Sequence, residues 1–597
     1  MAHRIAFLLL FVVGCAACES KQAAGALAGQ DASDVSSADI VADLGGDAAA
    51  LLDTATPADA IDADAGADTQ SASDAELVDL GSWRSELYGE HWSPDWSGPE
   101  GRFLHDFSYA GYENGASPLG VHRAEAVFDV TDFAASPGGV LDATEAIQAA
   151  IDAATSAGGG TVYFAPGLYR VDGRLFVRAS NIILKGDGPE ASRIHFTRVN
   201  AMSHTAHLTI GAAREMGASF VLAGDAISRT SFVEVADVSG LAVGDDVALG
   251  WQISDAFIEE HRMEGTWGAF NGTWQPFFRR TVVAIDDTSS PARVHLDVPL
   301  RYDARVRDQA SLRIELGLIE QCGVEGLGFA NATGWEEAWS QNQVHALFMD
   351  GVKDCWIQNV ASFASPSAPE HGPGAGAHLQ SGGILLRHAK RVTVADSSMA
   401  LPQHRGVGGN GYLFEVRQSN EVLFRDLVAR AGRHNFIQNW GFGTSGVVWL
   451  RAHSLQGRAL PSRDATISLV GHSEFHHSLA MANLIDSCLV EDGWSAVNRH
   501  KESSGAGHTA TESVFWNTRG AGIVRSFQAG HGYVIGTAPE TIVRTELPEI
   551  SAEQRELLEP ISPWGYSLPG DWTEGLGRGD ALVPASLYED QLRRRLP

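Results

Sequence analysis

GGGTVYFAPGLYRV, residues 158–171, is the stretch that decides the fold. The three glycines end a helical pattern, residues 161–164 have the composition of a short strand, Pro-Gly predicts a tight turn, and residues 168–171 predict a second strand. No helical pattern separates the two strands. This order of strand, tight turn and strand predicts a chain that coils and stacks on itself.

A single amphipathic helix is predicted directly upstream, over residues 142–154. Asp142 and Glu145 have the spacing of a capping box. One apolar stripe at helical spacing is formed by Ile147, Ala150, Ile151 and Ala154. Downstream of the glycines, short apolar runs continue at close spacing up to residue 196, so the helix stands alone at the start of the predicted coil.

The segment VFDVTDF (residues 127–133), the predicted helix and residues 158–171 together resemble the opening of pectate-lyase-superfamily proteins, in particular the rhamnogalacturonase and polygalacturonase-like members. The resemblance is specific over residues 127–196. It implies a right-handed parallel β-helix whose N-terminal helix covers the open end of the stack. The loop from Ala134 to Gly139 departs from the Gly-Asp-Gly pattern usual in that family. The resemblance therefore names a scaffold, and catalysis needs its own argument.

Short apolar runs resume after residue 319 at irregular intervals, which favours a parallel β-helix over a propeller. Residues 220–298 have longer β-rich runs and Trp-rich loops, which predict an insertion. The expected fold class is all-β, a right-handed parallel β-helix with an N-terminal capping helix and a β-rich insertion. The expected organisation is a signal and anchor (1–18), a disordered spacer (19–80), the capped start of the β-helix (81–216), the insertion (217–312), the main β-helix (313–549) and a C-terminal tail (550–597).

The N-terminus predicts export. Arg4 precedes an apolar run from Ile5 to Gly14 that is too short to span a bilayer. VVGC resembles a bacterial lipobox, which would leave Cys15 as the acylated N-terminus, and an ordinary cleaved signal is the alternative. Residues 20–79 are rich in Asp and Ala and contain no aromatic residue, so they predict a disordered spacer. We expect an exported protein that a lipid anchors to the bacterial cell envelope or surface.

The charge balance excludes one class of partner and suggests another. With 43 Lys and Arg against 74 Asp and Glu, the chain carries a net charge of −31, which argues against nucleic-acid binding. Residues 387–531 reverse this balance, with fifteen basic and eleven acidic residues and ten of the 22 histidines. A basic, His-rich face on an acidic body suits a polyanionic chain such as a polyuronate. For most of these side chains, an outward-facing, solvated position is the simpler interpretation.

The densest cluster of chemically active side chains lies between residues 471 and 508. A hydrolase needs two carboxylates that flank the glycosidic bond, whereas a lyase needs a base beside a uronate carboxylate and cations that stabilise the enolate. The predicted catalytic residues are Asp492, Lys501, Arg499, His476, His508 and Glu491. The predicted substrate-binding residues are Arg433, His434, His477, Trp494, Asn498 and His531.

No metal ligands are predicted with certainty. His476 and His477 are adjacent, and adjacent residues of a strand point to opposite faces, so these two and His508 do not predict a zinc triad. Calcium stays open because it is common among pectate-lyase relatives, although no calcium-loop signature is present. Its oxygen ligands could come from Asp486, Glu491 and Asp492. The three cysteines of the body, Cys322, Cys355 and Cys488, are expected at a shared buried strand position, and a Cys322–Cys355 pair is left open.

The sequence thus predicts an exported, pectate-lyase-like enzyme that cleaves an acidic, polyuronate-type glycan by β-elimination or by hydrolysis. A non-catalytic, cell-surface glycan-binding or adhesin β-helix is the alternative. The expected partners are a polysaccharide and, through the lipid anchor alone, a membrane.

Overall fold

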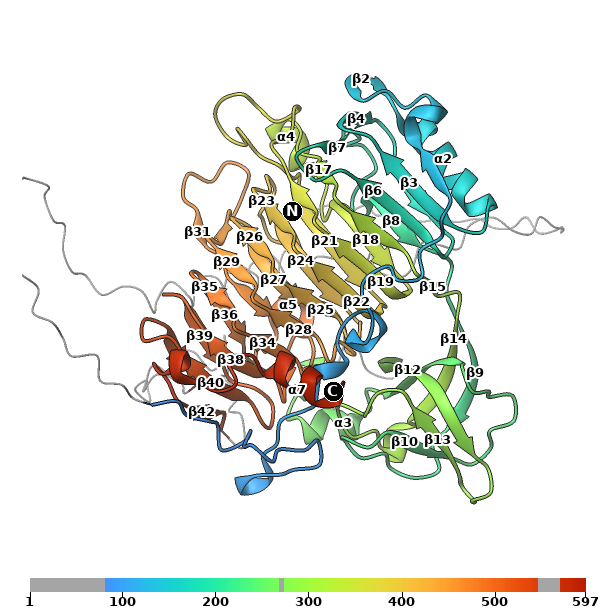
Figure 1. Ribbon diagram of the computed structural model, residues 1–597. Helices are drawn as coiled ribbons and strands as arrows, with labels where there is room; N and C mark the ends of the chain where they lie inside the picture. The colour runs from blue at the N-terminus through green and yellow to red at the C-terminus, as the bar shows by residue number, and fades with distance from the viewer. Residues whose placement is uncertain (1–80, 268–272, 546–569, 597) are drawn as a thin grey trace, which may run out of the picture.

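The computed structural model describes residues 81–267, 273–545 and 570–596. Its body is a right-handed parallel β-helix with three long sheets, and helix α2 (Thr144–Ser156) lies at the N-terminal end of the stack (Figure 1). The predicted fold class is confirmed. The predicted signal, anchor and spacer lie outside the described residues. No helix of the described residues is long and apolar enough to cross a membrane.

A complete turn of the coil contributes one strand to each of three sheets, which we call sheets I, II and III in chain order, and the last turns lack a strand in sheet II. Sheet I contains β1 (Val127–Asp129), β3 (Gly160–Phe164), β6 (Ile182–Gly186), β16 (Gly323–Glu325), β19 (Val352–Gln358), β22 (Lys390–Ala395), β25 (Leu423–Arg425), β28 (Val448–Leu450), β34 (Leu484–Asp486), β38 (Val514–Thr518), β40 (Tyr533–Thr537) and β42 (Trp572–Glu574), with β15 (Ile319–Glu320) beside β19. Sheet II contains β2 (Gly138–Asp142), β4 (Gly167–Val171), β7 (Ser192–Phe196), β17 (Gly328–Ala330), β20 (Ala361–Ser362), β23 (Ser398–Ala400), β26 (Val428–Arg430), β29 (His453–Leu455) and β35 (Leu489–Val490).

Sheet III contains β5 (Leu175–Val177), β8 (Ala206–Gly211), β18 (His345–Asp350), β21 (Gly382–Arg387), β24 (Tyr412–Arg417), β27 (His434–Gln438), β32 (Ser473–Phe475), β36 (Gly493–Ala496), β39 (Ile523–Ser526) and β41 (Ile542–Arg544). Loops between turns carry two small pairs, β30 (Arg458–Ala459) with β31 (Leu469–Val470) and β33 (Ala480–Met481) with β37 (Ala510–Thr511). The other α-helices of the described residues are α3 (Asp255–Glu260), α4 (Trp335–Ala338), α5 (Glu502–Gly505) and α7 (Leu587–Arg595).

The interior of the coil is apolar because alternate side chains of every strand point inward. Phe424 and Trp449, on neighbouring turns, stack with ring centroids 3.9 Å apart. Within the described residues all three cysteines are buried and free. Cys322 donates its backbone N–H to the sulfur of Cys355 on the next turn, whereas Cys488 lies at the corner between sheets I and II. The expected shared strand position therefore holds for two of the three cysteines and is wrong for Cys488.

A sharp corner joins sheet I to sheet II in turn after turn. One residue of each corner has a positive φ, for example 54° at Asn359, 52° at Asp396 and 56° at Asp426. The backbone N–H of that residue donates to a carbonyl of the next turn, at 3.2 Å from Asp396 to Arg425 and 2.9 Å from Asp426 to Leu450. Asn and Asp tolerate this left-handed conformation better than most residues, so these short polar residues stack at one edge of the coil.

Residues 215–316 leave the coil and form a separate antiparallel sheet, which lies beside the coil in Figure 1. Its strands, in pairing order, are β10 (Phe232–Val235), β13 (Ala292–Leu296), β12 (Trp274–Asp286), β11 (Asp246–Gln252), β14 (Ser311–Leu316) and β9 (Glu215–Val221). The coil closes beneath this insertion, because β6 pairs directly with β16 and β8 pairs directly with β18. Trp251 and Trp267 are buried within the insertion, as expected for most of its tryptophans.

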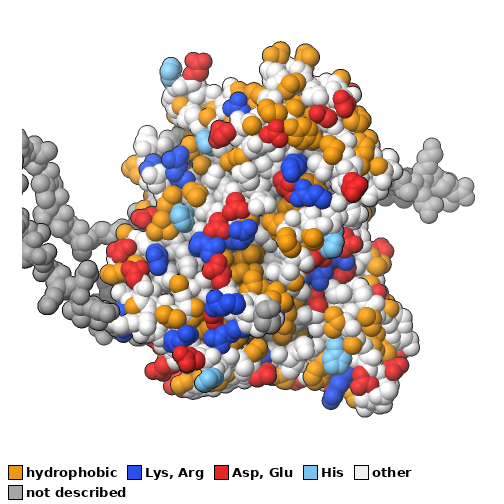
Figure 2. Space-filling model, in the orientation of Figure 1, with side chains coloured by type: hydrophobic (Ala, Val, Ile, Leu, Met, Phe, Trp, Pro, Cys, Tyr) orange, Lys and Arg blue, Asp and Glu red, His pale blue; other side chains and the backbone are white. Residues whose placement is uncertain are grey.

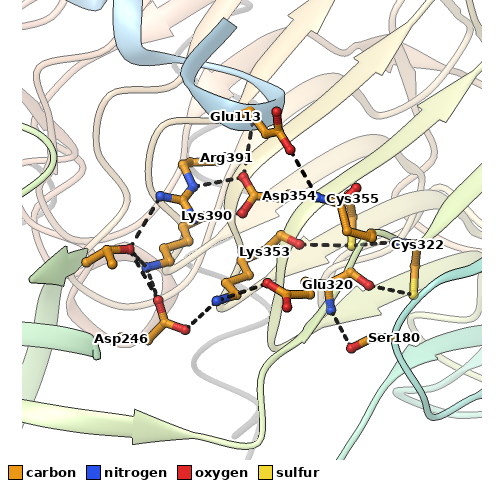
Figure 3. A network of polar contacts seen from close by, with 12 residues as sticks. Glu113, Ser180, Asp246, Glu320, Cys322, Lys353, Asp354, Cys355, Lys390 and Arg391 are labelled. Carbon is orange, nitrogen blue, oxygen red and sulfur yellow. Dashed lines mark hydrogen bonds and ion pairs between the residues drawn. The ribbon is translucent and has the colours of Figure 1, made fainter. Parts of the chain in front are cut away.

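Charged side chains fasten the insertion to the coil. Asp246 of β11 accepts hydrogen bonds from Lys353 at 2.8 Å and from Lys390 at 2.6 Å (Figure 3). Burial alone would raise the pKa of Asp246, yet the two lysines, Lys390 first, hold the pKa below its usual range. Lys353 is the second residue of β19 and Lys390 the first of β22, so one carboxylate of the insertion bridges two turns of the coil.

A second contact between insertion and coil is fully buried. Glu421 of the coil pairs with Arg301 of the insertion at 2.7 Å and with Arg280 at 3.2 Å. The side chains of all three residues are at most 1% exposed. Such a buried set is stable only while every charge keeps its partner.

The first and the last described segments of the chain pack together on the outer face of sheet I. Helix α7 lies against the N-terminal segment, where Tyr88 and Tyr588 join one apolar cluster with Trp516 of β38 (Figure 1). Tyr88 also donates to Asp590 of α7 at 2.8 Å. The last described residues therefore pack along the coil, as expected for the tail. Residues 546–569 of that tail lie outside the described residues.

Candidate functional site

The outer face of sheet III brings together polar side chains from distant parts of the sequence. The register places Glu415, Ile437 and Glu474 in one row across β24, β27 and β32. Their strand neighbours Phe414, Phe436 and Phe475 belong to the core, so this row faces outward. Neighbouring strands are about 4.8 Å apart, so the two glutamates of this row have backbones about 10 Å apart.

Glu474 is the centre of the first cluster. Its carboxylate contacts the Nδ1 atom of His476 directly, and the Nε2 atoms of His434 and His472 lie 3.4 and 3.5 Å from its oxygens. The guanidinium of Arg499 lies 3.7 Å from the same carboxylate and donates to His476 Nδ1 at 2.7 Å. Tyr412 lies beside these rings, with centroids 5.0 Å from His434. One buried carboxylate thus faces three imidazoles and one guanidinium.

The charges within this cluster are set by burial and by its neighbours. Burial alone would raise the pKa of Glu474, but the imidazoles and Arg499 around it hold that pKa well below its usual range. Burial also lowers the pKa of His434 well below its usual range, so this ring is neutral. At neutral pH the cluster therefore presents an ionised carboxylate, an arginine cation and a neutral imidazole.

Glu415 is the centre of a second cluster on the same face. Its side chain is fully buried and pairs with Arg417 at 2.5 Å and with the amide of Asn439 at 2.7 Å. His345 lies 3.6 Å from its second oxygen. Burial alone would raise the pKa of Glu415, but Arg417 and His345 hold it below its usual range. Neither glutamate of this face is a protonated acid near neutral pH.

Three of the predicted site residues meet in the first cluster: Arg499, His476 and His434. Two others lie on the same side of the coil with different contacts. Nδ1 of His477 forms a hydrogen bond with the hydroxyl of Ser478, and Nε2 forms one with the backbone carbonyl of Ser503. The ring centroid of His477 lies 4.4 Å from that of Trp440. Arg433 donates to the carbonyl of Gly406 at 3.0 Å. The sequence thus located the cluster, although not its central carboxylate.

Four further predicted residues make none of the contacts to the Glu474 carboxylate described above. Trp494 is 1% exposed and packs inside the coil against Phe436, so its ring has no face for a sugar. Asp492 lies in a turn, where it accepts from Asn435 at 2.9 Å and from the backbone of Gly457 at 2.8 Å. Burial raises its pKa, but its contacts are structural. Two exposed side chains complete this group: Glu491 and Lys501.

The acids proposed as calcium ligands do not converge. Asp486 is buried on sheet I, where it accepts from Ser586 and from the backbone N–H of Tyr588, both at 2.8 Å. Asp492 contacts Asn435 at the opposite edge of the turn. Glu491 is exposed. Because each carboxylate has a different set of neighbours, the three do not form one oxygen cage.

Asn498, His508 and His531 lie near the insertion. Asn498 accepts from the backbone of His500 at 2.8 Å. The ring of His508 lies 6.5 Å from that of Trp267, and burial lowers its pKa to about 3. His531 lines a cavity of about 330 Å³ between the insertion and the coil, together with Arg229, Tyr302 and Glu512. His531 therefore lines a cavity that holds no member of the Glu474 cluster, whereas Asn498 precedes Arg499 directly and pairs with His508 in an antiparallel bridge.

Glu512 gives this cavity a pH dependence. Its carboxyl lies 2.6 Å from Nε2 of His105, and burial raises its pKa to about 8 from an ordinary 4.5. The stability that this group contributes is complete below pH 4.5 and is lost as the pH rises towards 8. We predict that the free energy of unfolding of the native chain falls by up to about 4 kcal/mol over this range because of Glu512. Glu512→Gln should remove that part of the fall, as measured by denaturant unfolding at pH 5 and pH 8. Glu491→Gln, at an exposed carboxylate, should leave the pH dependence unchanged, and equal slopes in all three proteins would contradict the assignment.

Sequence reasoning missed the two central glutamates, His472 and Tyr412. Glu474 and His472 stood inside the sequence cluster, but only the strand register shows that Glu474 faces His434. The basic residues of this part of the chain were expected to form a positive face. Many instead pair along the stack, as Arg451 does with Asp426 at 2.7 Å. On the face shown in Figure 2, Lys and Arg side chains of the described residues lie beside Asp and Glu side chains, without one broad positive patch.

Comparison with known proteins finds one family model that matches part of the chain. Residues 127–234 match the family described as rhamnogalacturonase A/epimerase, pectate lyase-like. The resemblance to the pectate-lyase superfamily is confirmed. The pectate-lyase-like segment comprises the N-terminal cap, the first turns of the coil and the start of the insertion.

Curated relatives match a short part of the chain. Alginate lyase 7 of Azotobacter vinelandii is 50% identical over 68 residues, and mannuronan C5-epimerase AlgE6 of the same organism is 53% identical over 68 residues. Each match covers 10% of this chain and 8% of the relative, so the chain spans less than a tenth of these proteins.

Two solved structures are similar at low identity. The tailspike gp61 of Pseudomonas phage phi297 has a TM-score of 0.38 at 12% identity, covering 70% of this chain and 71% of the tailspike. An exopolygalacturonase from Thermotoga maritima has a TM-score of 0.28 at 10% identity, covering 71% of this chain and 76% of that enzyme. The fold of this pectate-lyase-like chain rests on its own strand pairing.

Proposed function

We propose that this protein acts on an acidic, uronate-containing polysaccharide that lies across the outer face of sheet III, and that it does so by β-elimination. The family match supports a polysaccharide-acting protein, and the curated relatives are named for reactions of alginate and mannuronan. A stack of parallel strands suits a polymer, because successive turns present side chains along one line.

The chemistry follows from the groups around Glu474. A β-elimination removes the proton at C5 of a uronate, forms the C4–C5 double bond and expels the oxygen at C4, which then takes up a proton. Arg499 is the group that would pair with the uronate carboxylate and stabilise the charge that develops when the C5 proton leaves. The side chains best placed to accept and return protons are Tyr412 and His472.

One observation carries the choice of elimination over hydrolysis. A glycoside hydrolase needs one protonated carboxylic acid beside one ionised carboxylate. Glu415 and Glu474 are the carboxylates in the outward row of sheet III, and both have a lowered pKa. The Glu474 cluster supplies the Arg499 cation and the neutral imidazole of His434 instead, which are the kinds of group that an elimination uses.

The test is an assay of the purified full chain against alginate, polygalacturonate and neutral glycans. Elimination creates an unsaturated uronate that absorbs in the ultraviolet, whereas hydrolysis creates only new reducing ends. Absorbance that grows with the reducing ends supports the proposal, and reducing ends without absorbance would replace it with hydrolysis. A change in the ratio of the two uronate epimers by NMR, without chain cleavage, would identify epimerisation. Binding without any change in the polymer would favour a glycan-binding protein or adhesin.

A further inference from the structure

The hydrogen bonds of His434 leave one of its ring nitrogens facing a carboxylate. Nδ1 contacts the backbone carbonyl of His472 at 2.6 Å, and because a carbonyl can only accept, Nδ1 carries the proton. Nε2, the other ring nitrogen, is buried, has no hydrogen-bond partner within the described residues and lies 3.4 Å from a carboxylate oxygen of Glu474. A cation between these two atoms would satisfy both of them.

Nδ1 of His476 lies at the same carboxylate, which contacts it directly. Arg499 donates to this nitrogen at 2.7 Å. The donor atoms of His434, Glu474 and His476 all lie within 4.8 Å of one another.

We propose that His434, Glu474 and His476 bind one divalent transition-metal ion such as Zn²⁺. Zinc bonds to imidazole nitrogen and carboxylate oxygen are about 2.1 Å long, which places two ligands of a tetrahedral ion about 3.4 Å apart. The distance from His434 Nε2 to Glu474 is 3.4 Å. Imidazole ligands favour zinc, nickel, copper or iron over calcium, which takes oxygen ligands.

Strand pairing and backbone hydrogen bonds hold the proposed ligands in place. His434 stands on β27 and Glu474 on β32, and these strands pair directly, so the ladder of sheet III fixes the two ligands relative to each other. The carbonyl of His472 holds the ring of His434, as the outer partners of metal-bound histidines usually do. On metal binding Arg499 gives up its bond to Nδ1 but keeps its bond to the carbonyl of His476, at 2.9 Å.

The test measures metal binding directly and does not depend on a substrate. The purified full chain is stripped with a chelator and titrated with Zn²⁺, Co²⁺ and Ca²⁺, with metal content measured by mass spectrometry and the Co²⁺ complex by visible absorption. We expect one equivalent of Zn²⁺ or Co²⁺ with a Kd below about 10 µM, a Co²⁺ spectrum typical of nitrogen and oxygen ligands, and a higher melting temperature with Zn²⁺. Native chain that binds neither Zn²⁺ nor Co²⁺, or that binds only Ca²⁺, would overturn the proposal.

Variants locate the ion. His434→Ala and His476→Ala should each weaken Zn²⁺ binding by at least about 100-fold. His453→Ala, which removes a half-buried histidine from β29 of sheet II, is the matched control and should bind Zn²⁺ like the native chain. Circular dichroism shows which variants keep the native fold. Undiminished binding by folded His434→Ala and His476→Ala would place the ion elsewhere and refute this site. Because binding is read without turnover, the site can hold even where β-elimination fails.

Discussion

Arg499→Ala should lower the rate of uronate-polymer cleavage by about 100- to 1,000-fold, which is the usual effect of removing one group that stabilises transition-state charge. The guanidinium of Arg499 lies 3.7 Å from the carboxylate of Glu474, and it donates to the carbonyl of His476. The loss should appear mainly in kcat, because the charge on the substrate increases when the C5 proton leaves. Initial rates of ultraviolet absorbance at several polymer concentrations measure both kcat and KM.

Two further variants make this prediction specific. Arg499→Lys keeps a positive charge without the planar fork and should recover part of the activity. Arg463→Ala removes an arginine that pairs with exposed Asp464 in the loop between sheets II and III, and it should leave the rate unchanged. If Arg499→Ala were as active as Arg463→Ala, the Glu474 cluster would not be the active site.

Glu421→Gln should lower the free energy of unfolding by about 3–5 kcal/mol, because it leaves two buried guanidinium groups without their shared carboxylate. Arg280 and Arg301 both belong to the insertion, so the first effect should be the release of the insertion from the coil. Denaturant unfolding measures the loss, and limited proteolysis within residues 215–316 detects the release.

The matched control for this prediction is Glu234→Gln. Glu234 pairs with Arg293 at 3.2 Å at the surface of the insertion, where both side chains are at least 34% exposed. Exposed pairs contribute at most about 1 kcal/mol, so this variant should unfold almost like the native chain. Equal losses in the two variants would show that Glu421 does not join the insertion to the coil.

The scaffold was predictable because its signals are local. The predicted strands at residues 161–164 and 168–171 correspond to β3 and β4, and the predicted helix at 142–154 corresponds to α2. Each of these follows from turn residues and hydrophobic period within about a dozen positions. The predicted capping box between Asp142 and Glu145 differs in one respect. Asp142 accepts from the backbone N–H of Thr144 rather than from that of Glu145.

The site was predictable only in part because it depends on register between turns. His434 and Glu474 are neighbours only because β27 pairs with β32, and no spacing in the sequence reveals that pairing. His476 and His477 follow β32, which ends at Phe475, and the proposed ligand His434 lies on the neighbouring strand β27, so alternation along one strand does not predict this site. The inward direction of Trp494 was also not predictable from local sequence. Whether a strand residue faces in or out depends on where the strand starts, and β36 starts at Gly493.

The way in which the coil closes beneath the insertion has an evolutionary consequence. The chain leaves and re-enters the stack at adjacent points, since Glu215 of β9 lies opposite Leu316 of β14. An ancestor could therefore have acquired this module in one step, without breaking any ladder of the older scaffold. Its later loss would be harder, because Lys390 and Glu421 are now buried and would be left with unpaired charges. The coil now needs the insertion to pair these two buried charges, so related proteins that descend from this one should retain the insertion together with Lys390 and Glu421 or lose all three together.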